Sequence, residues 1–541
     1  MRVVKILLEK KVRWIITIVF MIITLLISWN SDDAYHAYIM AKNFAEGNGL
    51  VYNTGYRVTA STCPLFTILV GGVYALFGCR YMYFAGILLG VILSTLAMYV
   101  LVFGICNTDA EAVYASVIIM SCYCFMSYTT SGLENSLLFF LAAVFVFILF
   151  SKDNLSLVDL FILAILISLL AMTRMDSVVL FIVPVCYGFW FCSKEKFIYR
   201  VLMGILGLLP FFVWEIFSLI YYGYPFPNTM YVKLNTGFPK AEYISRGIDY
   251  IIRSSLVDII LIILPFIILI LSIKRKKRRE CTVALGCLLY IAYVVYIGGD
   301  FMVGRHLTLP FFVSVMGIIV LYRDNRASKS YSSSFDRVVV VLICIQLIWS
   351  TCVRPVSKEY LYEENFGRAR TGVADEKHWY YSRTGFIPYV VSMINGGSSM
   401  RYEAQSLEVY SEIIEMSKEN KGCCTEFLPG IMNYYIQIDC DMYMTDKHGL
   451  MDPLLSHLPA HKEEGWRIGH MWRDIPEGYP ESIETGTNRI ENKELHEYYD
   501  KVLLIITGDI WDKERIKTII DMNLGKYDYL IEEYCSSLNN T

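Results

Sequence analysis

The sequence predicts a polytopic α-helical membrane protein that carries a polar C-terminal domain of mixed α/β type. Hydrophobic residues make up 55% of the 541 residues and charged residues only 18%, whereas about 25% of a soluble protein is charged. Several apolar runs reach the roughly 17 to 25 residues that cross a bilayer as a helix. These runs stop after Cys352, and residues 354–541 are polar and aromatic. The net charge of −3 indicates no general attraction to nucleic acid, so no nucleic-acid partner is expected.

The first apolar run, Trp14–Trp29, follows a basic start and is not followed by a small-residue cleavage site. It is therefore interpreted as a retained signal anchor. Further runs bring the predicted number of spans to about 11. They cover residues 83–104, 111–128, 133–150, 157–172, 176–192, 199–221, 256–273, 281–297, 307–322 and 336–352. A shorter run, Leu65–Phe77, is interpreted as re-entrant or interfacial, because counting it as a span would make the topology inconsistent.

Basic clusters between the runs orient the chain, and they lie at Arg2–Arg13, Lys194–Arg200, Lys274–Arg279 and Arg323–Lys329. The positive-inside rule places these clusters, and with them the N-terminus, in the cytoplasm. The chain is then a multi-pass protein of the cell (inner or plasma) membrane, with a transmembrane domain at residues 1–353 and an extracytoplasmic domain at 354–541. The loops rich in polar residues all fall on the external face, where we expect the chemistry to take place.

The polar domain contains a short apolar run, Lys501–Gly508 (KVLLIITG), followed by DIWDKERIKTIIDMN. This pattern predicts a strand, a turn and an amphipathic helix, which either Asp509 or Asp512 could cap. Four of the 15 cysteines fall in this part of the chain: Cys423, Cys424, Cys440 and Cys535. One disulfide could form among them, but its connectivity cannot be read from the sequence.

Two adjacent carboxylates, Asp32 and Asp33, open the first external loop at residues 30–64. Ionisable groups at the mouth of a membrane helix are costly unless hydrated, paired or catalytic, so one of them is a candidate general base. The alternative is helix capping, because any residue of Asn30–Asp33 could cap a helix that starts near Ala34. Further along, Gly47–Leu50 (GNGL) predicts a turn. Tyr35 and neighbouring tyrosines could stack on a sugar ring, although tyrosine is also common at membrane interfaces.

Cationic side chains recur on the other external loops and could grip a lipid phosphate. They are Arg174, Lys233, Arg305 and His306. Carboxylates accompany them at Glu134 and Asp176. The alternative is that these groups snorkel or pair among themselves, for example Arg174 with Asp176.

Two histidines of the polar domain, His448 and His470, lie in the segments DKHGL and RIGHM. With Asp446 they could bind a metal ion, but their spacing matches no known ligand pattern. Structural or substrate-contact roles are therefore favoured. No cofactor is predicted with certainty, and a divalent cation such as Mg²⁺ or Mn²⁺ at the acidic motif is left open.

The run DDAYHAYIMAKNFAEGNGLVYNTGYRVTASTCPL resembles the first external loop of GT-C fold glycosyltransferases, and it is most similar to the terminal β-arabinofuranosyltransferase-like family. Later stretches in chain order resemble the same group: SGLE, TRMD, YGYPFPNTMYVK, GGDFMVGRHLTLP, DKHGLMDPLLSHLP and WRIGHMWRDIPEGYPES. The chain departs from the family pattern at Thr62-Cys63-Pro64 and at His36. These departures affect the acceptor side, so arabinose itself is not assigned.

The resemblance implies transfer of a sugar, with a pentofuranose as one option, from a polyprenyl-phosphate donor to a cell-envelope glycan or glycolipid acceptor. Asp32 or Asp33 would act as the base in an inverting displacement, and Arg174, Lys233, Arg305 and His306 would hold the donor phosphate. The matching motifs also contain the candidate substrate-binding residues Tyr35, Glu134, Asp176, Asn228, Asp300, His448 and His470. This interpretation requires the acid pair and the cationic groups to converge at the outer leaflet.

A lipid-linked glycan transporter or polymerase is the main alternative. A transporter would place ionisable groups at the membrane midplane. The predicted spans are nearly free of charge, with Glu215 and Asp258 as the exceptions, and both could lie near span ends. A protein that only presents the C-terminal domain on a membrane anchor would need one span rather than about 11.

Overall fold

The computed structural model describes residues 10–78, 82–191, 193–234, 236–327, 333–353, 372–395, 415, 423–424, 430–440, 442–462 and 466–538. The chain forms two compact units, each assembled from three segments. Unit 1 comprises Met1–Ser31, Gly86–Phe211 and Pro239–Pro388, and unit 2 comprises Asp32–Ala85, Phe212–Phe238 and Tyr389–Thr541. The predicted division at residue 353 follows chain order and stays a prediction.

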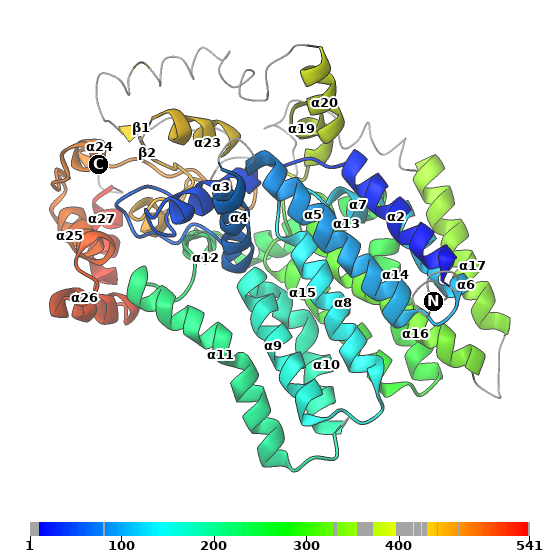
Figure 1. The fold of residues 1–541 in the computed structure, drawn as a ribbon. Coiled ribbons are helices and arrows are strands. Elements are labelled where there is room, and N and C mark those ends of the chain that lie inside the picture. The colour runs from blue at the N-terminus through cyan, green and yellow to red at the C-terminus, as the bar shows by residue number, and fades with distance from the viewer. Residues whose placement is uncertain are drawn as a thin grey trace. The chain divides into compact units, whose positions relative to one another are not determined.

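Unit 1 is helical in the residues that the structure describes (Figure 1). Its α-helices are α2 (Lys11–Leu26), α5 (Met82–Tyr99, from Gly86 onward), α6 (Asp109–Ser121), α7 (Tyr123–Ser127), α8 (Asn135–Ser151), α9 (Leu157–Thr173), α10 (Val178–Phe191), the first part of α11 (Phe197–Tyr221), α13 (Lys240–Val257), α14 (Ile260–Lys274), α15 (Arg278–Tyr296), α16 (Thr308–Ala327), α17 (Ser333–Ile348), α19 (Glu376–Thr384) and the start of α20 (Phe386–Ile394). Shorter 3₁₀ or π segments lie at Val100–Ile105, Met175–Ser177, Arg305–Leu307 and Trp349–Val353.

Unit 2 combines helices with one small parallel sheet. Its helices are α3 (Asp32–Ala45), α4 (Pro64–Phe77), the end of α11, α12 (Asn228–Leu234), the remainder of α20, α23 (Gly430–Asp439), a 3₁₀ turn at Leu455–His457, α24 (Tyr479–Thr485), α25 (Lys493–Thr507), α26 (Lys513–Asn523) and α27 (Asp528–Leu538). The sheet pairs β1 (Cys423–Cys424) with β2 (Tyr443–Met444).

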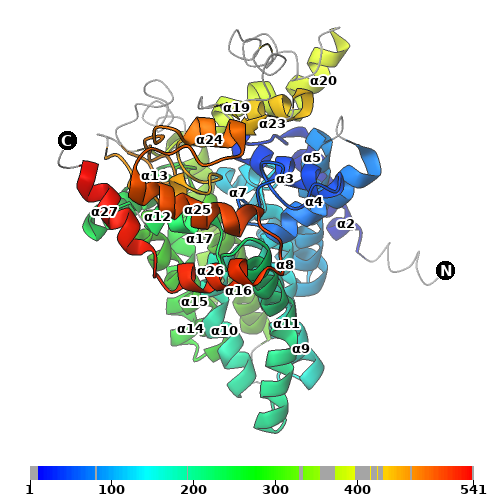
Figure 2. The same ribbon diagram turned by 90° about the vertical axis from the view of Figure 1, so that its left-hand side faces the viewer.

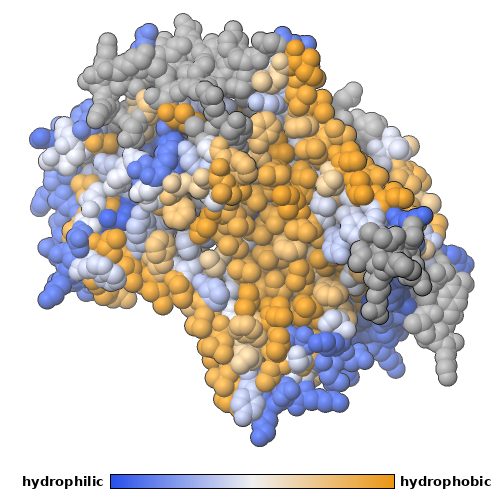
Figure 3. Space-filling view, in the orientation of Figure 1, coloured by the Kyte–Doolittle hydropathy of each residue, from blue (hydrophilic) through white to orange (hydrophobic). Residues whose placement is uncertain are grey.

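Four helices are long and apolar enough to cross a membrane, or five if the bent pair α13–α14 counts as one span, and five shorter apolar helices accompany them in the described residues. Apolar side chains gather on the surface over α5, α8, α9 and α10 (Figure 3). A large exposed apolar surface of this kind indicates contact with lipid. The prediction of a polytopic helical membrane protein is confirmed, whereas the number of 11 spans and the orientation of the termini stay predictions.

Two of the predicted apolar runs differ in detail from the sequence expectation. The run 111–128 is interrupted at Cys122, between α6 and α7. The short run Leu65–Phe77 forms one helix, α4, which has Pro64 in its first turn. Proline suits that position, because its missing N–H would have no intrahelical partner there.

The strand predicted at Lys501–Thr507 is wrong, because these residues form the last part of helix α25 (Figure 2). The apolar residues of α25 repeat at spacings of three and four and are buried against α26 and α27: they are Leu495, Tyr498, Tyr499, Val502, Ile505 and Ile506. A short apolar run does not by itself distinguish a strand from a buried helix. The helix predicted after it is confirmed as α26, which Asp512 caps by accepting from Arg515 N. The α/β character of the C-terminal part is unconfirmed, since its described strands are two residues each.

Irregular segments of unit 1 are held by backbone pairing. The segment before α3 runs beside residues 127–131: Trp29 donates through its indole to Ser127 O at 2.8 Å, and Ser31 N donates to Ser131 O at 2.8 Å. The segment after α15 forms a parallel bridge between Met302 and Ala374. Both pairings fix backbone next to the ends of apolar helices.

The packing of α13 on α15 depends on Gly247, since a Cβ there would lie 2.2 Å from Val295 O. We expect Gly247→Ala to lower stability by about 2 kcal/mol, because the contacted atom belongs to the backbone. On α4, no heavy atom lies within 4 Å of the position that a Cβ on Gly72 would take, so Gly72→Ala should be neutral or stabilising through helix propensity. Thermal unfolding of both variants in detergent checks this, and an equal change in the two midpoints would contradict it.

Candidate functional site

A buried ion-pair network in unit 1 is centred on Glu134, whose side chain is 2% exposed. Its Oε1 accepts from Arg174 Nη1 at 2.8 Å and from Arg305 Nη2 at 3.0 Å, and its Oε2 accepts from the same Arg305 nitrogen at 3.2 Å. The three residues come from the start of α8, the end of α9 and the turn that leads into α16. The structure therefore brings together three of the residues that the sequence nominated.

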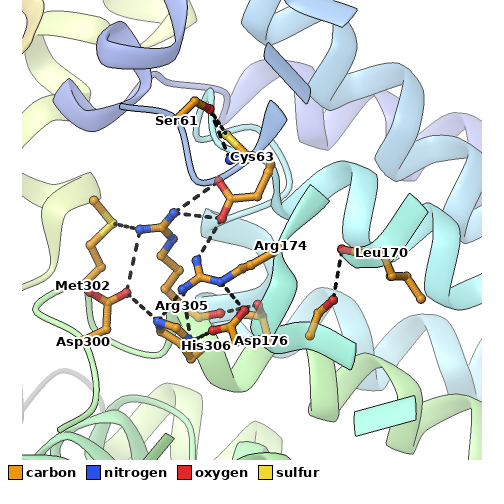
Figure 4. A network of polar contacts seen from close by, with 12 residues as sticks. Ser61, Cys63, Leu170, Arg174, Asp176, Asp300, Met302, Arg305 and His306 are labelled. Atoms are coloured by element: carbon orange, nitrogen blue, oxygen red, sulfur yellow. Dashed lines mark hydrogen bonds and ion pairs between the residues drawn. The ribbon is translucent and has the colours of Figure 1, made fainter. Parts of the chain in front are cut away.

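Two further carboxylates and a histidine complete this network (Figure 4). Asp176 Oδ1 accepts from Arg174 Nε at 2.9 Å, and Asp176 Oδ2 lies 3.6 Å from His306 Nδ1. Asp300 Oδ2 lies 3.4 Å from His306 Nε2 and 3.8 Å from Arg305 Nη1. Arg174 Nη2 and His306 Nε2 are 2.9 Å apart. The pairing of Arg174 with Asp176, the alternative to phosphate binding in the sequence analysis, is thus present.

Two tyrosines that sequence reasoning did not nominate hold His306. Tyr290 OH lies 3.2 Å from His306 Nδ1, and Tyr250 OH accepts from His306 N at 3.1 Å. Both rings are buried, on α15 and α13 respectively. Each tyrosine lies on the buried face of its helix, so nothing local distinguishes it from a core residue.

The charge balance limits what the network can bind. Three carboxylates face two guanidinium groups and one imidazole, so an incoming phosphate would add negative charge to cations that already have counter-charges. Asp300 Oδ1 accepts from Phe301 N at 2.8 Å, whereas its Oδ2, the oxygen that faces Arg305 and His306, accepts no hydrogen bond within the described part of the chain. A phosphate could therefore bind here by taking the place of Asp300 beside Arg305 and His306.

The acid pair begins helix α3 in unit 2. Asp32 and Asp33 form its first turn and are half-buried, and Asp32 Oδ1 accepts from Asp33 N at 2.9 Å. Negative charge in the first turn is favourable because of the helix dipole. The helix starts at Asp32 rather than near Ala34, so helix-start stabilisation and a catalytic role are both compatible with this position.

The surroundings of the acid pair are aromatic. Tyr35 is buried, with its ring centroid 5.2 Å from that of Tyr38 and 5.5 Å from that of Tyr434. His36, one turn after Asp32, packs against Gly430, where a Cβ would lie 3.0 Å from the imidazole. Burial lowers the pKa of His36, although Asp32 and Asp446 act in the opposite direction. His36 is thus a neutral imidazole near the acid pair at pH 7, a position that the sequence marked only as a departure from the family pattern.

The predicted turn after α3 is confirmed. Gly47 and Gly49 have φ angles of 85° and 91°, which glycine adopts without steric cost. Asn43 Nδ2 donates to the carbonyls of Val51 and Tyr52, each at 3.0 Å. These bonds fix the returning chain against the helix that carries the acid pair.

The loop Asp446–Arg473 brings the two nominated histidines together. The ring centroids of His448 and His470 are 5.2 Å apart, and Trp472 lies 5.0 Å from His448. Asp446 accepts from the amides of His448 and Leu450 at 2.9 and 2.7 Å, so its carboxylate shapes the loop. Burial lowers the pKa of both His448 and His470.

The remaining nominated residues of unit 2 lie on α12. Asn228 is buried, and its Nδ2 donates to Asp452 O at 3.0 Å, while its N donates to Thr59 O at 3.0 Å. These contacts give Asn228 a structural function. Lys233 is exposed, and its Cε lies 4.0 Å from the position that a Cβ on Gly469 would take.

Within the residues that the structure describes, no group of three or more His, Cys, Asp or Glu side chains is arranged to hold a metal ion. Cys535 is a free thiol, Cys440 Sγ donates to Ile436 O at 3.1 Å, and the side chains of Cys423 and Cys424 lie outside the described part. Convergence of the acid pair of unit 2 with the network of unit 1 stays a prediction.

No protein-family model matches the sequence, and no curated protein sequence matches it. A comparison with solved structures finds the crystal structure of ArnT from Cupriavidus metallidurans bound to undecaprenyl phosphate. That match has a TM-score of 0.42 and 12% sequence identity, and it covers 81% of this chain and 86% of that chain.

Glu134→Gln should destabilise unit 1 by about 3 kcal/mol, because both arginines would lose a buried counter-charge. Lys152→Gln is the matched control: Lys152 is 56% exposed and pairs with Asp159, which also accepts hydrogen bonds from Ser156. Loss of an exposed partner should cost less than about 1 kcal/mol. Thermal unfolding in detergent separates the two variants, and a Glu134→Gln midpoint as high as that of the control would show that Glu134 is dispensable.

Two buried groups of unit 2 predict opposite effects of pH on stability. Burial raises the pKa of Asp452 to about 6 and lowers that of His457 to about 4. The folded state then holds the Asp452 proton more tightly than the unfolded state between pH 4 and 6, so this group stabilises the fold as pH falls, by up to about 3 kcal/mol. His457 acts oppositely, since the unfolded state takes up its proton first between about pH 6.5 and 4.

Asp452→Asn should therefore lose more stability than the wild type between pH 6 and pH 4, and His457→Gln should lose less. Unfolding midpoints at pH 7, 6, 5 and 4 measure these slopes. Parallel curves for the wild type and both variants would contradict the assignment.

Proposed function

We propose that this protein is an integral membrane glycosyltransferase that moves a sugar from a polyprenyl-phosphate donor to a cell-envelope glycan or glycolipid on the outer membrane face. The observation that carries the proposal is the acid pair, which forms the first turn of a buried helix directly after the first apolar helix of the chain. The same residues open the longest stretch that resembles the GT-C enzymes.

In the proposed reaction, Asp32 or Asp33 accepts the proton of the acceptor hydroxyl. The hydroxyl oxygen then forms a bond to the anomeric carbon from the face opposite the donor phosphate, and the bond from that carbon to the phosphate oxygen breaks. Polyprenyl phosphate leaves with the electron pair, and the configuration at the anomeric carbon is inverted. A base in this position contributes about 10²- to 10⁴-fold to the rate.

The donor phosphate is proposed to bind the cationic side of the unit 1 network. Arg305 and His306 face Asp300 Oδ2, which is held by ion pairs at 3.8 and 3.4 Å, while Asp300 Oδ1 accepts a hydrogen bond from Phe301 N at 2.8 Å. Replacement of the Asp300 carboxylate by a phosphate would keep the charge of the network close to balance. Arg174 is bound to both Glu134 and Asp176, so we assign it the task of positioning Glu134 and His306 in addition to any contact with the donor.

The aromatic residues beside the acid pair are proposed to contact the acceptor sugar. Tyr35 and His36 follow the two acids on the same helix. Aromatic faces pack well on the apolar face of a sugar ring, and a neutral imidazole can accept or donate a hydrogen bond to a hydroxyl. The substitution of His36 for the usual residue of the motif then bears on which acceptor is used.

Asp32→Asn and Asp33→Asn test the proposal directly. We expect the variant that lacks the base to lose at least about 100-fold in turnover, with the protein still folded. The measurement is transfer from a panel of polyprenyl-phosphate sugars by the purified protein in liposomes. Glu46→Gln is the control, because Glu46 lies near the other end of α3 and pairs with Lys42. Full turnover in both aspartate variants would remove the acid pair from the reaction.

A further inference from the structure

Helix α13 (Lys240–Val257) stands at a steep angle to its neighbour α14. The two helices meet at Asp258 with a bend of 96°. Helix α14 is apolar along its length, and it is a candidate for crossing the membrane as part of the bent pair with α13. A helix perpendicular to a spanning neighbour runs along the membrane plane rather than through it.

Three distinct faces run along α13. The buried face carries Tyr243, Gly247, Tyr250, Ser254 and Val257. A charged face carries Glu242, Arg246, Asp249 and Arg253, with an ion pair of 3.2 Å between Arg253 and Asp249. The third face exposes Ile244, Ile248 and Ile252, at 37%, 49% and 54%. A helix with one buried face, one charged face and one face that is apolar and exposed is typical of a membrane interface.

Contacts with α15 place α13 at the level where an apolar helix ends. Lys240 Nζ lies 3.7 Å from the ring centroid of Tyr296, the last residue of α15. Tyr296 is itself 53% exposed, and tyrosines at the ends of spans mark the boundary between lipid and water. Gly247 then packs against Val295 O, one residue earlier. The exposed isoleucines thus run beside the rim of the apolar helices.

The buried face of α13 holds the loop that carries the ion-pair network. Tyr250 OH accepts from His306 N at 3.1 Å, and Ser254 Oγ accepts from Gly304 N at 3.0 Å. Tyr250 also packs on Gly299, where a Cβ would lie 2.5 Å from the Cβ of Tyr250 and 2.7 Å from its ring. The position of α13 therefore also determines the position of the loop that carries Asp300, Arg305 and His306.

We propose that the isoleucine face of α13 is inserted into the interfacial layer of the bilayer, and that α13 fixes the depth of the network loop relative to the lipid surface. The occupant of this face is the upper acyl region of one leaflet, continuous with the lipid around α14 and α15. Lys240, which is exposed at the start of the helix, suits the adjoining phosphate headgroups. The inference does not depend on the chemistry proposed above, because its readout is a lipid adduct.

The test is photo-crosslinking of the full-length protein in liposomes of phosphatidylethanolamine and phosphatidylglycerol. A benzophenone amino acid replaces Ile248 in one variant and Asp249 in a matched variant, whose side chain lies on the charged face of the same helix turn. A third variant carries the label at Ile270 of α14, which is 51% exposed and serves as the reference for a residue within the membrane. Mass spectrometry of the labelled peptide identifies what each position captured.

We expect phospholipid adducts at positions 248 and 270, and at least fivefold less lipid adduct at position 249. A crosslink from position 248 to another segment of the same chain would overturn the proposal, because that segment would cover the isoleucine face. A crosslinked dimer through position 248 would overturn it in favour of a contact between two copies. Equal lipid labelling at positions 248 and 249 would also overturn it, since α13 would then lack an oriented lipid face.

Discussion

The carboxylate of Glu134, buried between two guanidinium groups, is the polar contact that most constrains unit 1. Helix α8 begins at the next residue, Arg174 ends α9, and Arg305 opens the turn before α16. A buried charge that loses its partner costs roughly 3 to 5 kcal/mol, so these three helix ends have to stay together. The charged side chains of this network therefore lie together at helix ends, and the helices that lead to them can remain apolar.

Buried polar groups also need partners at the positions where the apolar helices are interrupted. An interruption inside an apolar region exposes backbone amides that no lipid group can satisfy. At the break between α6 and α7, Asp258 Oδ2 accepts from Cys124 N at 2.8 Å, and its other oxygen accepts from Gln346 Nε2 at 2.9 Å. Asp258 is one of the two charged residues that the sequence places within predicted spans. Its position at a bend, bound to backbone, indicates a structural role rather than a transport site.

The sequence predicted those helices, turns and helix caps that are determined by short-range residue patterns. Long apolar runs gave helices close to their expected positions, the paired glycines gave the turn after α3, and Asp512 gave a helix cap. The run at Lys501–Thr507 was misjudged because its helical period is visible only when Leu495, Tyr498 and Tyr499 are included. Ion pairs between residues far apart in the sequence could not be predicted. Glu134 pairs with Arg174, which is 40 residues away along the chain, and with Arg305, which is 171 residues away. Tyr250 and Tyr290 were missed for a related reason, because a tyrosine on the buried face of a helix looks the same in the sequence whether or not it contacts a histidine far along the chain.

The carboxylates of unit 2 differ in what their surroundings leave them able to do. Asp446 accepts from three backbone amides, those of His448, Leu450 and Met451. Asp452 is fully buried and accepts from the amides of Leu454 and Leu455 and from Tyr479 OH. A carboxylate committed in this way shapes a loop and cannot approach a substrate hydroxyl without unfolding it. Asp32 and Asp33 are instead half-buried, and an amide of their own helix orients Asp32. A general base needs an oriented oxygen within reach of the acceptor hydroxyl, so the proposed reaction assigns the proton to this pair, while Asp446 and Asp452 hold their loop.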